Sequence, residues 1–161
     1  MRPSREDARP PRGETFLKVA EAFAERSTCL RGKVGAVIVK DKHIISHGYN
    51  GAPPGMPQCD EVGCEVPSCT CNQEPCNMFC PSQIGCQRTI HAEANAIAWA
   101  ARWGVIVNGA TMYSTHEPCR KCADLIVACG IQIVYFHKPY RLGAGQFLRD
   151  AGVDCRMMTQ A

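Results

Sequence analysis

The chain has 161 residues, of which 45% are hydrophobic, and this length and composition fit one globular domain with a substantial core. No apolar run is long enough for a membrane helix and no signal-peptide core is present, so we expect a cytoplasmic protein. The formal net charge of only +3 argues against a protein built to bind nucleic acid.

The N-terminal segment Met1–Gly13 is rich in proline and arginine and has no apolar stretch, so we expect a disordered basic tail. A single domain over residues 14–161 should follow it. Its first element is predicted to be an amphipathic helix over Glu14–Arg26, because apolar residues recur there at helical spacing.

A hairpin comes next, with strands Val34–Val39 and Ile44–Tyr49 on either side of the polar turn Lys40–His43. From Ala52 to Arg88 the sequence has no useful periodicity, and a cysteine-rich insertion occupies about residues 59–86. Only metal ions could organise so polar a loop.

The second half alternates helices with strands, which predicts a three-layer α/β/α fold with a mixed sheet of about five strands and helices on both faces. The expected elements are a helix Ile90–Trp103, a strand Thr111–Ser114, a helix Cys119–Cys129, a strand Ile131–His137, a short helix Gln146–Ala151 and a last strand Val153–Met157.

Two short motifs carry the chemistry, His91-Ala92-Glu93 and Pro118-Cys119-Arg120-Lys121-Cys122. Cysteines three residues apart on a helix share one face, so Cys119 and Cys122 can hold one metal ion. With His91 they provide three ligands and leave a fourth tetrahedral position for water, which is the arrangement of a catalytic zinc site. We expect both motifs at helix N-termini, where the helix dipole favours a thiolate and a hydroxide.

Glu93 follows the ligand His91 at the start of a helical run, and we predict that it transfers protons and is not a metal ligand. Taken separately, the two cysteines would also suit half of a structural zinc knuckle, and Glu93 would suit an acidic residue in a first helical turn. The two motifs together, in this order, are typical of zinc-dependent nucleobase deaminases.

Further segments of the sequence narrow the class of deaminase that the motifs indicate. The chain from about Phe16 to Met157 resembles the deoxycytidylate (dCMP) deaminases of bacteria and phages, in the cytidine-deaminase-like superfamily. This resemblance implies a cytidine-deaminase-like α/β/α fold and hydrolysis of dCMP to dUMP and ammonia for thymidylate synthesis, in the host cytoplasm if a phage encodes the chain. The matching segments are Ser27-Thr28-Cys29-Leu30-Arg31, Val34-Gly35-Ala36-Val37-Ile38-Val39, Ala128-Cys129-Gly130-Ile131 and the most discriminating one, Gly48-Tyr49-Asn50-Gly51.

The resemblance also implies substrate contacts. Asn50 is similar to the residue that holds the nucleotide sugar, and Tyr140 is similar to the aromatic residue that lies against the pyrimidine ring. Arg31 or Arg141 would suit the phosphate. Each has a plainer alternative, since Asn50 can serve a turn, Tyr140 can pack at the edge of the core and the arginines can be solvated. The histidines without an assigned role are His43, expected in an exposed turn, and His116 and His137, expected near the pocket, where their side chains could equally serve packing.

The chain has twelve cysteines, and eight of them lie between Cys29 and Cys86. Eight is the number that two closed tetrahedral zinc sites require, so we predict one or two structural zinc ions besides the catalytic one, about three in all. Free thiols or disulfides are the alternative, and other partitions of the eight are open. By resemblance, one structural site includes Cys29 and Cys59, and Cys64 and Cys86 could complete it. A second site would then use Cys69, Cys71, Cys76 and Cys80, whereas Cys129 and Cys155 are expected to be buried thiols.

Other functions stay open at this point. A deaminase of a modified cytidylate such as a 5-substituted dCMP, or of another base such as a riboflavin precursor or a tRNA adenosine, would carry the same zinc motifs. A zinc-ribbon nucleic-acid-binding module would explain the cysteines and the basic tail, but not the low net charge. The family is commonly hexameric and regulated by dCTP and dTTP, so the resemblance implies a homo-oligomer with these effectors and no membrane partner.

Overall fold

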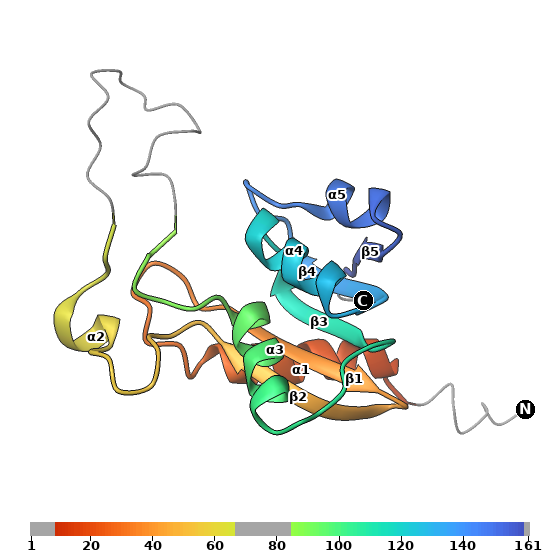
Figure 1. Ribbon diagram of the computed structural model, residues 1–161, viewed down its shortest axis with the longest axis horizontal. Coiled ribbons are helices and arrows are strands. Elements are labelled where there is room, and N and C mark those ends of the chain that lie inside the picture. The colour runs from red at the N-terminus through yellow and green to blue at the C-terminus, as the bar shows by residue number, and fades with distance from the viewer. Residues whose placement is uncertain (1–8, 67–84, 160–161) are drawn as a thin grey trace, which may run out of the picture.

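A computed structural model of the chain describes residues 9–66 and 85–159 (Figure 1). No helix in these two ranges is both long and apolar enough to cross a membrane. In chain order the elements are α1 (Arg12–Ala24), β1 (Gly35–Lys40), β2 (His43–Tyr49), α2 (Cys59–Val62), α3 (Ala92–Arg102), β3 (Thr111–His116), α4 (Arg120–Ala128), β4 (Ile133–Lys138), α5 (Gly145–Asp150) and β5 (Asp154–Met157).

The five strands form one mixed sheet in the order β2-β1-β3-β4-β5. β1 runs antiparallel to both β2 and β3, whereas β3, β4 and β5 are parallel to one another. Asp41 and Lys42, which join β1 to β2, have φ angles of 49° and 68°. Two successive residues with positive φ are typical of the short hairpin turn whose twist matches that of the strands. The predicted hairpin and mixed sheet are confirmed.

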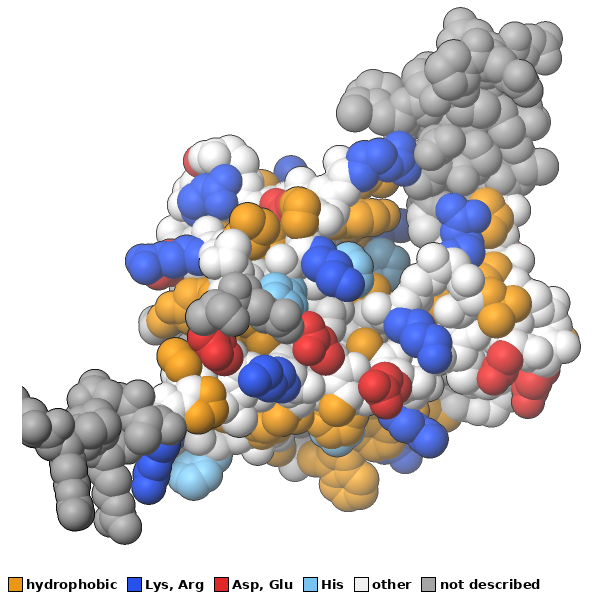
Figure 2. Space-filling model, turned by 180° about the vertical axis from the view of Figure 1, so that it is seen from behind, with side chains coloured by type: hydrophobic (Ala, Val, Ile, Leu, Met, Phe, Trp, Pro, Cys, Tyr) orange, Lys and Arg blue, Asp and Glu red, His pale blue; other side chains and the backbone are white. Residues whose placement is uncertain are grey.

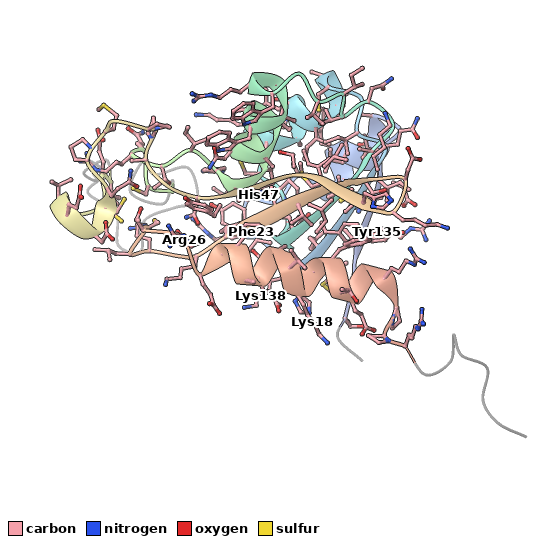
Figure 3. All side chains as sticks on the ribbon, turned by 90° about the horizontal axis from the view of Figure 1, so that it is seen from below. Lys18, Phe23, Arg26, His47, Tyr135 and Lys138 are labelled. Atoms are coloured by element: carbon pink, nitrogen blue, oxygen red, sulfur yellow. The ribbon has the colours of Figure 1, made fainter. Side chains whose placement is uncertain are left out.

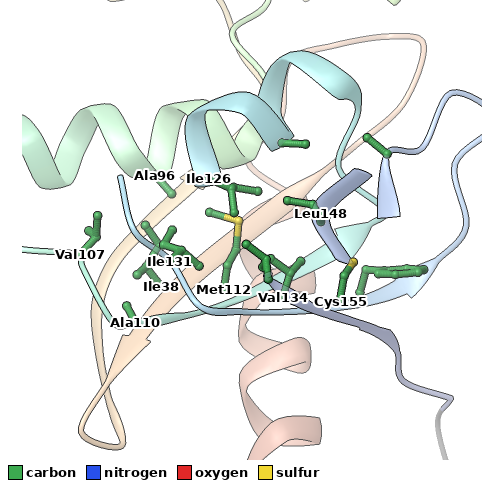
Figure 4. Close-up of a cluster of buried hydrophobic side chains, with 14 of the residues drawn as sticks. Ile38, Ala96, Val107, Ala110, Met112, Ile126, Ile131, Val134, Leu148 and Cys155 are labelled. Carbon is green, nitrogen blue, oxygen red and sulfur yellow. The ribbon is translucent and has the colours of Figure 1, made fainter. Parts of the chain in front are cut away.

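Helices cover both faces of the sheet, as predicted. α1 packs on β1 and β3 from one side, whereas α3, α4 and α5 lie on the other side (Figure 3). The larger core cluster lies between the sheet and these three helices (Figure 4). Its fully buried side chains include Ile38, Met112, Ile126 and Leu148, one from each of β1, β3, α4 and α5.

Two glycines let helices approach the sheet closely. A methyl group at Gly35 would overlap the backbone of α1 at Ala20, and one at Gly48 would overlap the backbone of α3 at Ala92 and Ala96. Because backbone atoms cannot rotate away, only glycine fits at these points. Gly48 therefore fixes the distance between β2 and the helix that begins directly after His91.

Two local features differ from expectation. α1 begins at Arg12, so the last two residues of the predicted tail are helical; Pro11 is the residue before it, and its carbonyl accepts the Thr15 N–H at 3.2 Å. The segment predicted to lack regular structure contains α2. Gln58 and Glu61 cap its N-terminus reciprocally, and Cys59 is its first residue.

Candidate active site

A cavity of about 310 Å³ opens where the segments after β2, β3 and β4 meet the N-termini of α3 and α4. The space-filling view shows histidine side chains inside a hollow of the surface, with Lys and Arg side chains around its rim (Figure 2). The carboxyl ends of the parallel strands β3 and β4 point to this region. Ligands commonly bind at such ends in α/β sheets.

Three potential metal ligands converge in the cavity. His91 is the residue before α3, Cys119 is the residue before α4, and Cys122 lies in the first turn of α4. His91 Nδ1 lies 3.3 Å from Cys119 Sγ and 3.5 Å from Cys122 Sγ. Tetrahedral zinc with ordinary Zn–N and Zn–S bonds would separate these atoms by roughly 3.6 Å. The donor set therefore fits zinc, and two of its members, His91 and Cys119, line the cavity.

The protonation of this cluster also suits a cation. The hydrogen bond from Cys122 lowers the pKa of the Cys119 thiol to about 4, and the contact with His91 acts in the same direction. The pKa of Cys122 is raised, because it donates to Cys119 and is desolvated by burial. The hydrogen bond to Cys119 raises the pKa of His91, although burial opposes this. The low pKa of Cys119 makes it a thiolate at neutral pH, which is the form that binds a metal cation.

Glu93 lies in the first turn of α3, next to the ligands, and its side chain also lines the cavity. The residue is only 3% exposed, and its Oε2 is 3.6 Å from Cys122 Sγ. Burial raises the pKa of its carboxyl group above the ordinary value, although its own backbone N–H and His91 oppose this. A carboxyl group with a raised pKa can both accept and donate a proton near neutral pH.

Asn50 lines the cavity at the end of β2 and is 7% exposed. Its Oδ1 accepts the Val34 N–H at 2.7 Å, and its Nδ2 donates to the Gly32 carbonyl at 2.8 Å. The buried Ser27 hydroxyl donates to the Asn50 carbonyl at 2.7 Å. Asn50 therefore orders the segment before β1 that brings Arg31 to the cavity. Its φ is not positive, so it does not adopt the left-handed conformation that asparagine often takes in turns.

Tyr140, Arg31 and Arg141 line the same cavity. His116 lines it too, with its Nδ1 3.0 Å from the Thr115 hydroxyl, and burial followed by the charge of Lys138 lowers its pKa.

The other two histidines lie elsewhere. The expectation that His137 lies near the pocket is wrong: its Nδ1 is 2.8 Å from Glu21 Oε1 of α1, on the opposite face of the sheet. His43 is exposed at the start of β2, as expected.

A second cluster holds Cys29, Cys59, Cys64 and Cys86, with all four sulfurs within 4.8 Å of one another. Cys29 Sγ is 3.8 Å from Cys64 Sγ, and Cys59 Sγ is 3.6 Å from Cys86 Sγ. These separations are too long for disulfides and agree with the roughly 3.8 Å edge of a zinc–thiolate tetrahedron. The set therefore fits a closed structural zinc site.

This four-cysteine cluster adjoins the cavity, which Cys29 and Cys86 line, and all of its members except Cys64 are buried. Burial raises the pKa of Cys59 to about 12. Burial acts in the same direction on Cys64, but the Leu30 N–H and the neighbouring thiols outweigh it and lower the pKa of Cys64. The remaining four cysteines of the predicted second site, Cys69, Cys71, Cys76 and Cys80, lie outside the described residues.

Sequence reasoning missed Glu117, which also lines the cavity and directly precedes Pro118. The position of this glutamate before the Pro-Cys motif and the two nearby glycines Gly143 and Gly145 were the available signals. Both glycines pack against its carboxyl group. The contact joins positions far apart in the chain, so periodicity could not reveal it.

The three-layer fold and the ligand set define a zinc deaminase of nucleobases. Residues 11–138 match the family model described as the cytidine and deoxycytidylate deaminase zinc-binding region. The chain therefore belongs to the cytidine and deoxycytidylate deaminase family, and the predicted resemblance is confirmed.

Known relatives agree with this assignment. Over 131 residues the chain is 40% identical to the deoxycytidylate deaminase of Mycobacterium phage D29. The aligned region covers 81% of this chain and 98% of the phage protein. Over 140 residues it is 38% identical to ComE operon protein 2 of Bacillus subtilis. Here the aligned region covers 86% of this chain and 66% of that protein. A crystal structure of the dCMP deaminase from cyanophage S-TIM5, in complex with dCMP and dUMP, aligns with a TM-score of 0.74 and 30% identity over 98% of this chain and 99% of that one.

Proposed function

We propose that this protein is a zinc-dependent dCMP deaminase that hydrolyses dCMP to dUMP and ammonia. The observation that carries the proposal is the buried carboxyl group of Glu93 beside a His-Cys-Cys cluster that opens into a cavity. The D29 and S-TIM5 proteins, named for dCMP, support the choice of substrate. A nucleic-acid-binding zinc ribbon would need neither the cavity nor the buried acid.

His91, Cys119 and Cys122 would hold the catalytic zinc, which supplies a Lewis acid able to activate water at neutral pH. Glu93 takes the proton of the attacking water and delivers it to the cytosine ring nitrogen beside carbon 4. It then takes the proton of the hydroxyl group formed on carbon 4 and delivers it to the amino group, so that ammonia leaves and the carbonyl group of dUMP forms. Burial supports this role, because it raises the pKa of Glu93 and keeps bulk water from competing for the proton.

The rest of the cavity supplies candidate substrate contacts. Tyr140 offers an aromatic face for the pyrimidine, and Asn50 retains one unused amide hydrogen for a sugar hydroxyl. Arg31 and Arg141 offer guanidinium groups for the phosphate. We propose these four roles because all four side chains line the cavity.

We infer one structural zinc in the four-cysteine cluster, and a second in the Cys69, Cys71, Cys76 and Cys80 set remains a prediction. The sulfur separations of the first cluster support it. The homo-oligomeric state, the dCTP and dTTP effectors and the cytoplasmic location are expectations from the family resemblance. Sedimentation with and without each nucleotide would test the first two.

An ammonia-release assay tests the proposed function directly. It compares dCMP with CMP, deoxycytidine, 5-methyl-dCMP and a stem-loop RNA. We expect dCMP to give the highest kcat/KM. If 5-methyl-dCMP or the RNA gives the highest kcat/KM, that molecule is the substrate in place of dCMP. If the zinc-loaded protein deaminates none of these compounds, the proposal is rejected.

The variant Glu93→Gln tests the proton-transfer role. Glutamine keeps the shape of the side chain but cannot carry the proton, so we expect kcat to fall by at least about 100-fold. Zinc content should stay at the wild-type value. The exposed Asp124→Asn, on α4, is the matched control and should retain full activity. Residual activity of Glu93→Gln near that of the control would reject the role.

A further inference from the structure

The segment from Pro139 to Ala144, between β4 and α5, forms one wall of the cavity through Tyr140 and Arg141. It is an irregular connection, so its conformation depends on contacts outside the sheet ladder. The Gly143 N–H donates to the Tyr140 carbonyl at 2.8 Å and closes a turn. The Ala144 N–H donates to the Pro118 carbonyl at 2.9 Å. The segment therefore folds back onto the residues that precede α4.

Glu117 holds this segment at both ends. Its Oε2 accepts the Tyr140 N–H at 3.3 Å, and its Oε1 accepts the Gly145 N–H at 3.0 Å. The Glu117 backbone is itself fixed, because its N–H donates to the Lys138 carbonyl at 2.8 Å. Both oxygens of one carboxylate thus bind backbone N–H groups on either side of the turn. Charge-assisted bonds of this kind are stronger than those between neutral groups.

The packing shows that the segment is shaped around this carboxylate. A methyl group at Gly143 would overlap the Glu117 carboxyl group, and one at Gly145 would lie 2.6 Å from Oε1. Neither glycine has a positive φ. Their small size, and not backbone freedom, is therefore what the contact with Glu117 requires.

These backbone N–H groups occupy both carboxylate oxygens of Glu117. It is absent from the ligand cluster formed by His91, Cys119 and Cys122, and Glu93 is the carboxyl group in contact with those ligands. We propose that Glu117 is a positioning residue that holds Tyr140 and Arg141 at the cavity wall, and so sets substrate binding in the deaminase reaction proposed above.

The isosteric variant Glu117→Gln tests the proposal. A glutamine side chain has one acceptor oxygen and one NH₂ group, so it can accept one N–H but must oppose the other. We expect KM for dCMP to rise by about 10- to 100-fold, with kcat changed much less and zinc content unchanged. Asp150→Asn, which removes an exposed carboxylate from α5, should leave both constants unchanged.

Hydrogen–deuterium exchange gives a readout that needs no substrate. In Glu117→Gln the amides of residues 140–145 should exchange faster, whereas those of β4 should keep the wild-type rate. Gly143→Ala should reproduce both the exchange pattern and the KM effect, because its methyl group displaces the segment from the other side. If the wild-type protein fails to deaminate dCMP, the proposed function falls, but the exchange result still decides whether Glu117 holds the segment.

A double-mutant cycle tests whether the effect passes through the wall residues. If it does, Glu117→Gln combined with Tyr140→Ala should lose little more kcat/KM than the worse single variant. Three results would overturn the proposal: multiplicative losses in the cycle, a fall in kcat with KM unchanged, or wild-type exchange in residues 140–145.

Discussion

Replacing Gly48 by alanine tests how closely β2 controls the position of the catalytic helix. The added methyl group would overlap the Ala92 carbonyl oxygen and the Ala96 amide nitrogen, and would lie 3.1 Å from the Ala96 Cα. Ordinary contacts between carbon atoms need about 3.5–4.0 Å, so α3 and β2 must separate by on the order of 1 Å. The clash is with backbone atoms, so no side-chain rotation can relieve it.

Two effects of different size should follow. Overpacking of this kind costs about 1–3 kcal/mol of unfolding free energy, which for a chain of this length lowers Tm by roughly 2–12 °C. Activity should suffer more, because the N-terminus of α3 carries His91 and Glu93. A displacement of reactive groups by about 1 Å can cost 100-fold, so we expect kcat/KM for dCMP to fall by about that factor.

Gly51→Ala is the matched control from the same Gly-Tyr-Asn-Gly segment. Its methyl group would find its nearest neighbours at 3.6 Å, an ordinary contact, and Gly51 does not have a positive φ. Thermal unfolding followed by circular dichroism and the ammonia-release assay should therefore give near wild-type values. Wild-type Tm and kcat/KM in Gly48→Ala, or equal damage in Gly51→Ala, would refute the reasoning.

Two further outcomes concern the metal and the pH. Cys59→Ser should contain one zinc fewer than the wild type and unfold about 10 °C lower or more. The control Cys129→Ser, which lies outside both clusters, should keep the wild-type zinc content. If elemental analysis finds only one zinc per wild-type chain, the structural site is excluded and the catalytic site is not affected. Burial and Lys138 lower the pKa of His116, so the unfolded chain binds a proton that the folded chain resists. The unfolding free energy should therefore fall as the pH drops below about 6.5, and it should fall less steeply in His116→Gln. Urea titrations of both proteins at pH 5 to 7 measure this, and an equal dependence of unfolding free energy on pH in the two proteins would contradict it.

The sequence was most informative where chemistry and local structure coincide. The ligands His91, Cys119 and Cys122 could be selected because each motif stands at the start of a helical run, and the same runs predicted α3 and α4 to within two residues. Runs rich in β-branched residues predicted β1 and β2, of which β1 is buried on both faces of the sheet and β2 is only partly buried.

Features that depend on distant contacts could not be predicted in this way. Nothing local marks Glu117 as the partner of Tyr140 and Gly145, because the two segments meet only once β3 and β4 pair. His137 was misplaced because alternation along a strand leaves two faces, and its pairing with Glu21 selects the face of α1. α2 was missed because a helix of four residues is too short to show a period.

The four-cysteine cluster also closes the base of the cysteine-rich insertion. Cys64 and Cys86 lie in this cluster, and the Gln87 N–H donates to the Glu65 carbonyl at 2.8 Å beside them. The Arg88 side chain adds a bond to the Gly63 carbonyl at 3.1 Å. A stretch of chain whose ends are fixed in this way can lengthen or shorten at small entropic cost and without moving the cavity. A change of chain length between Cys64 and Cys86 should therefore leave the cavity wall at Cys29 and Cys86 in place, which makes this stretch suited to grafting a tag or a second domain.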